Sequence, residues 1–490
     1  MSLSQSIRSS AKWLLAGNLG NSLLGFAFGI VLARLLVPED FGLIVTVQIF
    51  TGVAGLVAGG GMGQALVRAS EADAHDFNVV FTIQIGICAV IYLLFFVLAP
   101  YFAVWYREPI YESLLRVTAL SFLLRPLVGT HNAWLSREMQ FKARSIVQVS
   151  CGVITSVLSI VMAWHEMGVW SLTLSGIFGS IVSWALLSRL TPLRPKLTFD
   201  RATARRLTGV GIRFSLLDII SYLRRQSTNF VIGRMVNPAA VGLYNKADSL
   251  GKLPFSTISS AVYQPVFRAL SIEQHNLDKS KYIFFRTVML LLVYSAPAYI
   301  TFSILAEPFI RVVYGSNWVE SAAPMSILAW AWMFSCVNQP AGALLAAQGK
   351  LQQEIIVQAT TLVLNVVACA VGLRWGLVGV AWGMILVRLY TVTHMLLLVN
   401  TCFRLKRQEF FDAVRPGLVL GASTAFILLS FTLMVPDAMK IKHEMVFLGA
   451  ALAVSGSSFF LMMLFPPIKG LTDESTRWRK ALRITRKTVA

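Results

Sequence analysis

Charged and polar side chains recur at helical spacing inside apolar stretches of this sequence. Between residues 215 and 229, Asp218, Tyr222 and Arg225 stand at i, i+4 and i+7, with Arg224 beside them. That spacing places the first three on one face of a helix. A guanidinium matches the geometry of a phosphate group, and it costs at least about 2.5–3.5 kcal/mol at mid-bilayer unless a cavity or a partner receives it. The segment therefore predicts a site for an anionic ligand.

Cationic side chains within other apolar stretches extend this prediction. Arg125 precedes Pro126, which predicts a kink that frees backbone carbonyls. Lys252 lies on a polar helix face, and Arg388 lies in the middle of its own apolar run. The full set of predicted substrate-binding residues is Arg224, Arg225, Arg125, Lys252, Arg388, Tyr222, Asn18 and Asn21.

Two interpretations of these residues stay open. In the first, Asp218 forms a structural ion pair with Arg225, and the other cations bond backbone carbonyls. In the second, the cations face a water-filled cavity and hold an anionic substrate. Asp218 is also a candidate proton or sodium site, a weaker hypothesis because Arg225 is a ready structural partner.

The composition defines the class of protein that must position these residues. The chain has 490 residues, of which 56% are hydrophobic and 13% charged, with a mean hydropathy of +0.67. Soluble domains carry about 25% charged residues. A soluble enzyme is therefore excluded, and the fold class predicted is an all-α polytopic membrane protein.

Apolar runs of about 20 residues, the length that crosses a bilayer, divide the chain into about 14 predicted transmembrane helices. They lie near 12–36, 41–66, 78–100, 114–135, 145–164, 168–188, 212–236, 248–268, 282–305, 322–347, 354–373, 377–399, 411–435 and 444–465.

The formal net charge of +20 follows largely from topology. With the N-terminus inside, 28 of the 43 Lys and Arg residues fall in loops on that side and eight on the other. The positive-inside rule then places both termini in the cytoplasm. Arg116 and Arg286 lie near span ends, where they can snorkel to the interface. The basic tail Arg477–Lys487 is interpreted as a solvated retention charge, with anionic headgroups as an alternative partner.

An internal repeat organises the predicted spans. At an offset of 200 residues, Arg34–Leu43 matches Arg234–Leu243 at its Arg, Pro, Gly and Leu positions. The offset covers six spans, so both copies cross the membrane in the same direction, as in a parallel repeat. The predicted domains are a six-helix bundle at 1–190, a cytoplasmic basic linker at 191–211, a second six-helix bundle at 212–400, two additional helices at 401–466 and a basic tail at 467–490.

Several kinds of chemistry find no support in the sequence. The chain has no Gly-x-x-x-x-Gly-Lys-Ser/Thr loop for a nucleotide. Its five cysteines are isolated, without a Cys-x-x-Cys pair, and its six histidines lack ligand spacing. We therefore expect no metal and no cofactor, and the basic charge does not predict a nucleic-acid partner.

An ordered set of short motifs carries a family resemblance. The motifs are Ala11–Trp13, Val31–Leu36, Phe41–Leu43, Gly242–Ala247, Pro265–Leu270 and Val313–Trp318. With fourteen spans, the chain resembles the polysaccharide repeat-unit flippases (Wzx-type, polysaccharide transporter family) of the multidrug/oligosaccharidyl-lipid/polysaccharide exporter superfamily. Essential arginines that some members carry in the first two spans have no counterpart here, so the site residues rest on the residue patterns above.

The resemblance implies a transporter rather than an enzyme. Its implied substrate is an undecaprenyl-diphosphate-linked oligosaccharide, a precursor of exopolysaccharide, capsule or lipopolysaccharide. It would cross the bacterial inner membrane by alternating access through a cationic central cleft. Membrane lipids, a polysaccharide polymerase and a chain-length regulator are the other implied partners.

Three alternative functions remain, and one of them, a passive lipid scramblase, is not distinguished by any residue pattern in the sequence. A multidrug or other organic-ion antiporter of the same fold needs buried carboxylates, and Asp218 is the single clear one in the sequence. A membrane polysaccharide polymerase or ligase usually has a long periplasmic loop, which is missing between the predicted spans.

Overall fold

The protein is described by a computed structural model that covers residues 3–69 and 72–482, and the secondary structure throughout these ranges is helical, without strands. The first helices are α1 (Leu3–Leu35), α2 (Pro38–Gly59), α3 (Met62–Arg68), α4 (Ala74–Tyr106), α5 (Ile110–Arg137), α6 (Phe141–Trp164), α7 (Val169–Leu190) and α8 (Arg201–Met235). They are followed by α9 (Pro238–Ile272), α10 (Leu277–Ile304), α11 (Ala306–Tyr314), α12 (Ala322–Ala347), α13 (Leu351–Gly372) and α14 (Gly376–Asn400). The last are α15 (Arg407–Met434), α16 (Asp437–Lys442), α17 (Glu444–Leu464) and α18 (Thr472–Ala481).

The long helices lie where the hydrophobic runs predict them. Thirteen of the fourteen predicted spans coincide with one helix of at least 21 residues. Nine segments of the described chain are long and apolar enough to cross a membrane, and one of these, Gln352–Asn400, contains both α13 and α14. The all-α membrane fold is confirmed, and these segments are consistent with fourteen spans.

One predicted span is interrupted. The run predicted at 41–66 is divided into α2 and the short α3 because Gly60 and Gly61 adopt left-handed backbone angles, with φ of 52° and 61°. Glycine tolerates this region because it has no Cβ. The hydrophobic pattern continues through the break, so hydropathy alone misses it.

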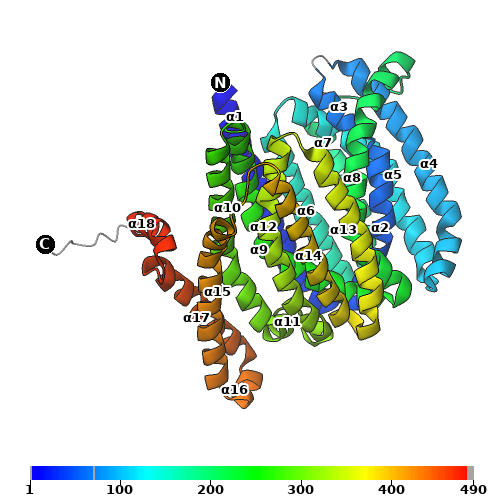
Figure 1. Cartoon of the computed structure of the whole chain (residues 1–490). Coiled ribbons are helices and arrows are strands. Elements are labelled where there is room, and N and C mark those ends of the chain that lie inside the picture. Colours follow the sequence, from blue (N-terminus) through cyan, green and yellow to red (C-terminus); the bar gives the residue numbers. More distant parts are fainter. Residues whose placement is uncertain (1–2, 70–71, 483–490) are drawn as a thin grey trace. The chain divides into compact units, whose positions relative to one another are not determined.

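The chain divides into two compact units, one ending at Gly242 and one beginning at Leu243. In the first unit α8 packs against α2, α3 and α4, although its sequence makes it the first helix of the second repeat copy. In the second unit α10 packs against α12 and α15, and α17 packs against α15 (Figure 1). The additional helices α15 and α17 therefore extend the second unit.

The segment before α8 is extended and fixed to α4. The backbone N–H of Lys196 donates to Asn78 Oδ1 at 2.9 Å, and that of Thr198 donates to Thr82 Oγ1 at 2.8 Å. Asp200 then caps α8, because it accepts a bond from the backbone N–H of Thr203 at 2.9 Å. Hydrogen bonds from Thr203 lower the pKa of Asp200. The helix thus begins at Arg201, inside the segment predicted as a linker.

The repeat is visible in the backbone. α1 ends at Leu35 and α2 begins at Pro38, and 200 residues later α8 ends at Met235 and α9 begins at Pro238. Gly42 and Gly242 lie against each other near the starts of α2 and α9, where a Cβ on Gly42 would overlap the carbonyl of Pro238 and a Cβ on Gly242 that of Pro38. The two copies of the motif therefore touch backbone to backbone.

This contact yields a stability prediction. Gly42→Ala should lower the free energy of unfolding by about 1–3 kcal/mol, because a methyl group would be forced into a carbonyl that belongs to a packed backbone. The matched control is Gly86→Ala in α4, where a Cβ meets nothing within 4 Å. The melting temperatures of the two purified variants in detergent check the prediction, and equal values would contradict it.

Candidate functional site

Arg125 lies in the first unit, where its guanidinium packs on the backbone of α2. A Cβ on Gly55 would lie 2.8 Å from Nη1 of Arg125, so this position admits the guanidinium because it carries no side chain. Arg125 lines a cavity of about 240 Å³ that also includes Asp218 of α8. The cavity thus brings one predicted cation and the predicted acid together.

The rest of this cavity wall combines two glutamines and several glycines with apolar side chains. Gln84 of α4 donates from Nε2 to the carbonyl of Gly59 at 3.4 Å, close to the break between α2 and α3. The remaining lining residues are Gly55, Leu56, Ala58, Gly61, Gly63, Gln64, Cys88, Pro126 and Gly129. A cavity with exposed backbone, two glutamine amides and one charge of each sign can bind a polar or zwitterionic group by hydrogen bonds.

The three predicted residues that follow Asp218 on α8 have other surroundings. The hydroxyl of Tyr222 donates to the carbonyl of Gln48 at 2.7 Å, and a Cβ on Gly52 would overlap that hydroxyl. Arg225 is exposed and donates from Nη1 to Ser221 Oγ at 2.7 Å.

Arg224 is half-buried, and neither it nor Arg225 lines the cavity of Arg125. The ion pairs of the described chain do not include Asp218 with Arg225. The structural pairing considered for these two residues is therefore absent, and Asp218 faces the cavity instead.

The predicted asparagines of α1 do not join this cavity. The Oδ1 atom of Asn21 would lie 3.0 Å from a Cβ on Gly152, so its side chain faces α6. The side chain of Asn18 lies outside the described part of the structure. The role of Asn18 and Asn21 in substrate binding therefore stays a prediction.

A second polar cluster lies in the second unit around Trp332 of α12. The guanidinium carbon of Arg388 is 4.7 Å from the Trp332 ring centroid, and Nζ of Lys252 is 5.7 Å from it. The indole Nε1–H donates to Asp248 Oδ1 at 2.9 Å. α9, α12 and α14 thus bring two predicted cations and one acid around a single aromatic ring, where cation–π attraction is strongest for Trp.

The charge of this cluster is unbalanced. Arg388 and Lys252 both act electrostatically on the Asp248 carboxylate, so two cations share one acid. A net positive charge in partly buried surroundings is attracted to a polyanion more strongly than the same charge in water, because the local dielectric is lower.

Asp248 is the site residue that the sequence reading missed. The predicted span began at residue 248, which put this acid at the membrane edge, whereas α9 begins at Pro238 and places Asp248 almost three turns inside the helix. Two signals were available in the sequence. Asp248 stands four residues before Lys252, on the same helix face, and the repeat offset of 200 residues pairs Pro38 with Pro238, which predicts an earlier helix start.

Several known proteins are similar to this chain. Residues 31–323 match the model of a family described as "Polysaccharide biosynthesis protein". The lipopolysaccharide biosynthesis protein WzxC of Escherichia coli (strain K12) is 22% identical over 440 residues, which cover 88% of this chain and 85% of that protein. The succinoglycan biosynthesis transport protein ExoT of Rhizobium meliloti (strain 1021) is 23% identical, over 65% of this chain and 64% of that protein.

A solved structure shares the fold. The lipid II flippase MurJ in an inward closed conformation superposes with a TM-score of 0.74 at 14% sequence identity, covering 96% of this chain and 100% of that one. At this level of identity the likeness concerns the arrangement of the helices.

The Trp332 cluster yields a coupling prediction. Trp332→Phe keeps an aromatic ring beside Arg388 but removes the donor to Asp248, which should cost about 1–3 kcal/mol because a half-buried carboxylate loses a hydrogen-bond partner. In an Asp248→Asn background the same substitution should cost less, since no charge is left unsatisfied. Melting temperatures of the four proteins form a double-mutant cycle, and additive losses would show that the bond does not stabilise the cluster.

Proposed function

The chain belongs to the polysaccharide biosynthesis protein family, and on that premise we propose that it is a flippase for an undecaprenyl-diphosphate-linked oligosaccharide repeat unit. The proposed transport uses alternating access, with a cationic cleft that binds the diphosphate. Relatives named for lipopolysaccharide and succinoglycan biosynthesis, and a lipid II flippase of the same fold, support this assignment.

The observation that carries the proposal is the excess of cations around Trp332. Arg388 is positioned by the indole ring, which leaves guanidinium N–H groups to donate to phosphate oxygens in a bidentate manner. Lys252 adds a second, more mobile charge beside it. A diphosphate would compensate the charge that Asp248 alone leaves uncompensated.

The cavity around Arg125 supports a role toward the sugar. Its amide side chains and exposed glycine backbone are hydrogen-bonding groups of the kind that recognise hydroxyls, and its single cation is accompanied by Asp218. We propose that this cavity contacts the polar oligosaccharide and that Asp218 is available for coupling to a proton or sodium ion.

An apolar cavity in the second unit suits the polyprenyl tail. It has a volume of about 300 Å³ and lies along α10, α11 and α17. The polar atoms in its wall are satisfied internally, since Thr301 Oγ1 and Ser455 Oγ are 2.6 Å apart. Phe302, Phe309 and Phe459 supply aromatic surface to the wall, so an isoprenoid chain gains contact there without displacing a hydrogen bond.

The proposed setting is the bacterial inner membrane, with both termini in the cytoplasm as the cation distribution predicts. There the flippase would deliver substrate to a polysaccharide polymerase and a chain-length regulator. Nothing in this assignment requires a cofactor or a nucleic acid.

An organic-ion antiporter is the second candidate, favoured by the two carboxylates Asp218 and Asp248. Asp248, however, is outnumbered by Arg388 and Lys252, which repel a cationic drug. Efflux of a cationic dye from cells that overproduce the protein distinguishes the two functions, and we expect no efflux above background. Dye extrusion without polysaccharide export would favour the antiporter.

The central test concerns Arg388 and Lys252. Arg388→Gln should lower polysaccharide export about tenfold or more, because a charge-assisted hydrogen bond to substrate is worth about 1.5–3 kcal/mol, and adding Lys252→Gln should abolish export. The control is Arg374→Gln, which removes an exposed cation from the same region of sequence. Export and the accumulated lipid-linked precursor are measured in a transporter-deficient strain, with protein level in the membrane as a check. Normal export by the double variant would contradict the cationic-cleft proposal.

A separate test concerns the two adjacent arginines of α8. We expect Arg224→Ala combined with Arg225→Ala to abolish export while leaving membrane insertion intact, since both were predicted to bind substrate. The matched control is Arg234→Ala on the same helix, where the guanidinium lies 5.8 Å from the Trp105 ring centroid. Full export by the arginine pair variant would restrict the binding site to the clusters of Arg125 and Arg388.

A further inference from the structure

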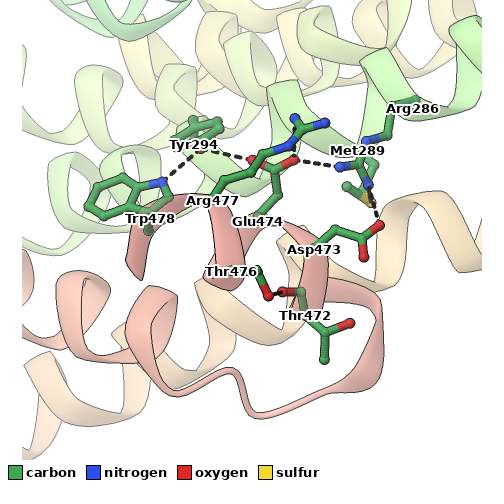
Figure 2. Close-up of polar contacts among 9 residues, drawn as sticks. All are labelled: Arg286, Met289, Tyr294, Thr472, Asp473, Glu474, Thr476, Arg477 and Trp478. Carbon is green, nitrogen blue, oxygen red and sulfur yellow. Dashed lines mark hydrogen bonds and ion pairs between the residues drawn. The ribbon is translucent and has the colours of Figure 1, made fainter. Parts of the chain in front are cut away.

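The short helix α18 is attached to α10 by a buried acid. Glu474 is only 4% exposed, and its Oε1 lies 2.5 Å from Nη2 of Arg286 on α10 (Figure 2). The same carboxylate accepts from the Tyr294 hydroxyl at 3.4 Å and from Nη1 of Arg477 at 3.0 Å. One carboxylate thus receives bonds from α10 and from its own helix, which is the arrangement that a buried charge requires.

Trp478 adds further contacts between α18 and both α10 and α17. Its Nε1–H donates to the Tyr294 hydroxyl at 3.1 Å, as Figure 2 shows. Its ring centroid lies 6.1 Å from that of Phe459 and 5.9 Å from that of Phe460, both on α17. The hydroxyl of Ser475 donates to the carbonyl of Leu464 at 2.9 Å, at the end of α17. Contacts from two sides therefore hold α18 in place.

The same contacts place α18 at one end of the apolar cavity. Tyr294 and Phe459 are cavity-lining residues, and Trp478 touches both of them. Leu305 and Phe309 line the cavity at least eleven residues further along the chain from Tyr294, so they lie toward the opposite end of α10. Trp478 therefore packs behind two lining residues at the Tyr294 end of the cavity, while the residues of α18 are not themselves part of the lining.

We propose that α18 braces the end wall of the apolar cavity, which Tyr294 and Phe459 form, and that Glu474 is the positioning residue that holds α18 in place and so keeps this wall closed. The wall limits how far an apolar chain can extend along α10 and α17 and keeps water out of that end. That the chain is a polyprenyl tail rests on the proposed function. The closure itself rests on the contacts of Glu474 and Trp478.

Removal of the Glu474 charge should release the wall. Arg286 would keep only Asp473, whose carboxylate is 4.0 Å away and 77% exposed, and an exposed pair at that distance contributes little. Arg477 is the matched control, because it bonds the same carboxylate while its side chain is 68% exposed.

Thiol labelling in a background without the five native cysteines measures the release. Ser475→Cys reports on docking, because Ser475 is 2% exposed in the closed state. Ser455→Cys reports on closure, because Ser455 lines the cavity and is only 8% exposed. A water-soluble maleimide reacts with a thiolate that water reaches.

With Glu474→Gln we expect both introduced thiols to react at least about tenfold faster, because breaking a buried ion pair is strongly destabilising. With Arg477→Gln the rates should stay within about twofold of the parent. Exchanging the pair, Arg286→Glu with Glu474→Arg, should return the rates toward the parent, and this exchange guards against a folding defect of the single variant.

Two outcomes overturn the proposal. An unchanged labelling rate in the Ser475→Cys protein shows that Glu474 does not hold α18. A faster rate in that protein without a change in the Ser455→Cys protein shows that α18 does not keep the end of the cavity closed. Neither measurement involves a lipid-linked sugar. If the parent protein exports no lipid-linked sugar while both labelling responses occur, the flippase assignment is contradicted and the end-wall proposal is still supported.

Discussion

A cation inside an apolar helix needs a counter-charge, an aromatic face or a set of acceptors, because water is not there to solvate it. The structure meets this requirement in a different way at each costly cation. Arg125 lies on glycine backbone beside a cavity that also contains Asp218. Arg388 stacks on Trp332, and Arg286 pairs with Glu474 of α18. Each of these three contacts joins residues from at least two helices, and it therefore constrains how those helices pack.

The position of Arg125 on the backbone of α2 depends on a close approach between helices. α2 presents Gly52 to the Tyr222 hydroxyl and Gly55 to the Arg125 guanidinium, and in both places a methyl group would collide with the incoming polar atoms. Gly42 allows a still closer approach, in which backbone meets backbone at the start of α9. Small residues have the same role at helix contacts in membranes generally. In the first unit, glycines thus leave the space in which the Tyr222 hydroxyl and the Arg125 guanidinium lie.

The helices and their positions were predictable from hydrophobic run length, and the repeat was predictable from spaced Pro and Gly residues. The break at Gly60 was not, because hydropathy is insensitive to φ. Asp248 was missed because a span boundary placed by hydropathy stops at the first charge, although α9 continues through it. The partner of Arg286 was missed because Glu474 is 188 residues away in the sequence, and no periodicity connects them. Lys252 and Arg388 were predicted singly, whereas their convergence on Trp332 depends on tertiary packing.

The repeat explains why the two units carry such different polar clusters. An offset of 200 pairs Gln48 with Asp248 and Gly52 with Lys252. In the first copy the matching positions of α2, Gln48 and Gly52, are uncharged, and the cation beside them comes from the fourth helix, α5, through Arg125. In the second copy α9 carries Asp248 and Lys252, α14 adds Arg388, and the fourth helix, α12, contributes Trp332 as a neutral platform. The first unit thus contains a hydrogen-bonding cavity with one charge of each sign, and the second unit contains a cationic cluster. These two sites fit the proposed substrate, whose two polar parts are a sugar and a diphosphate.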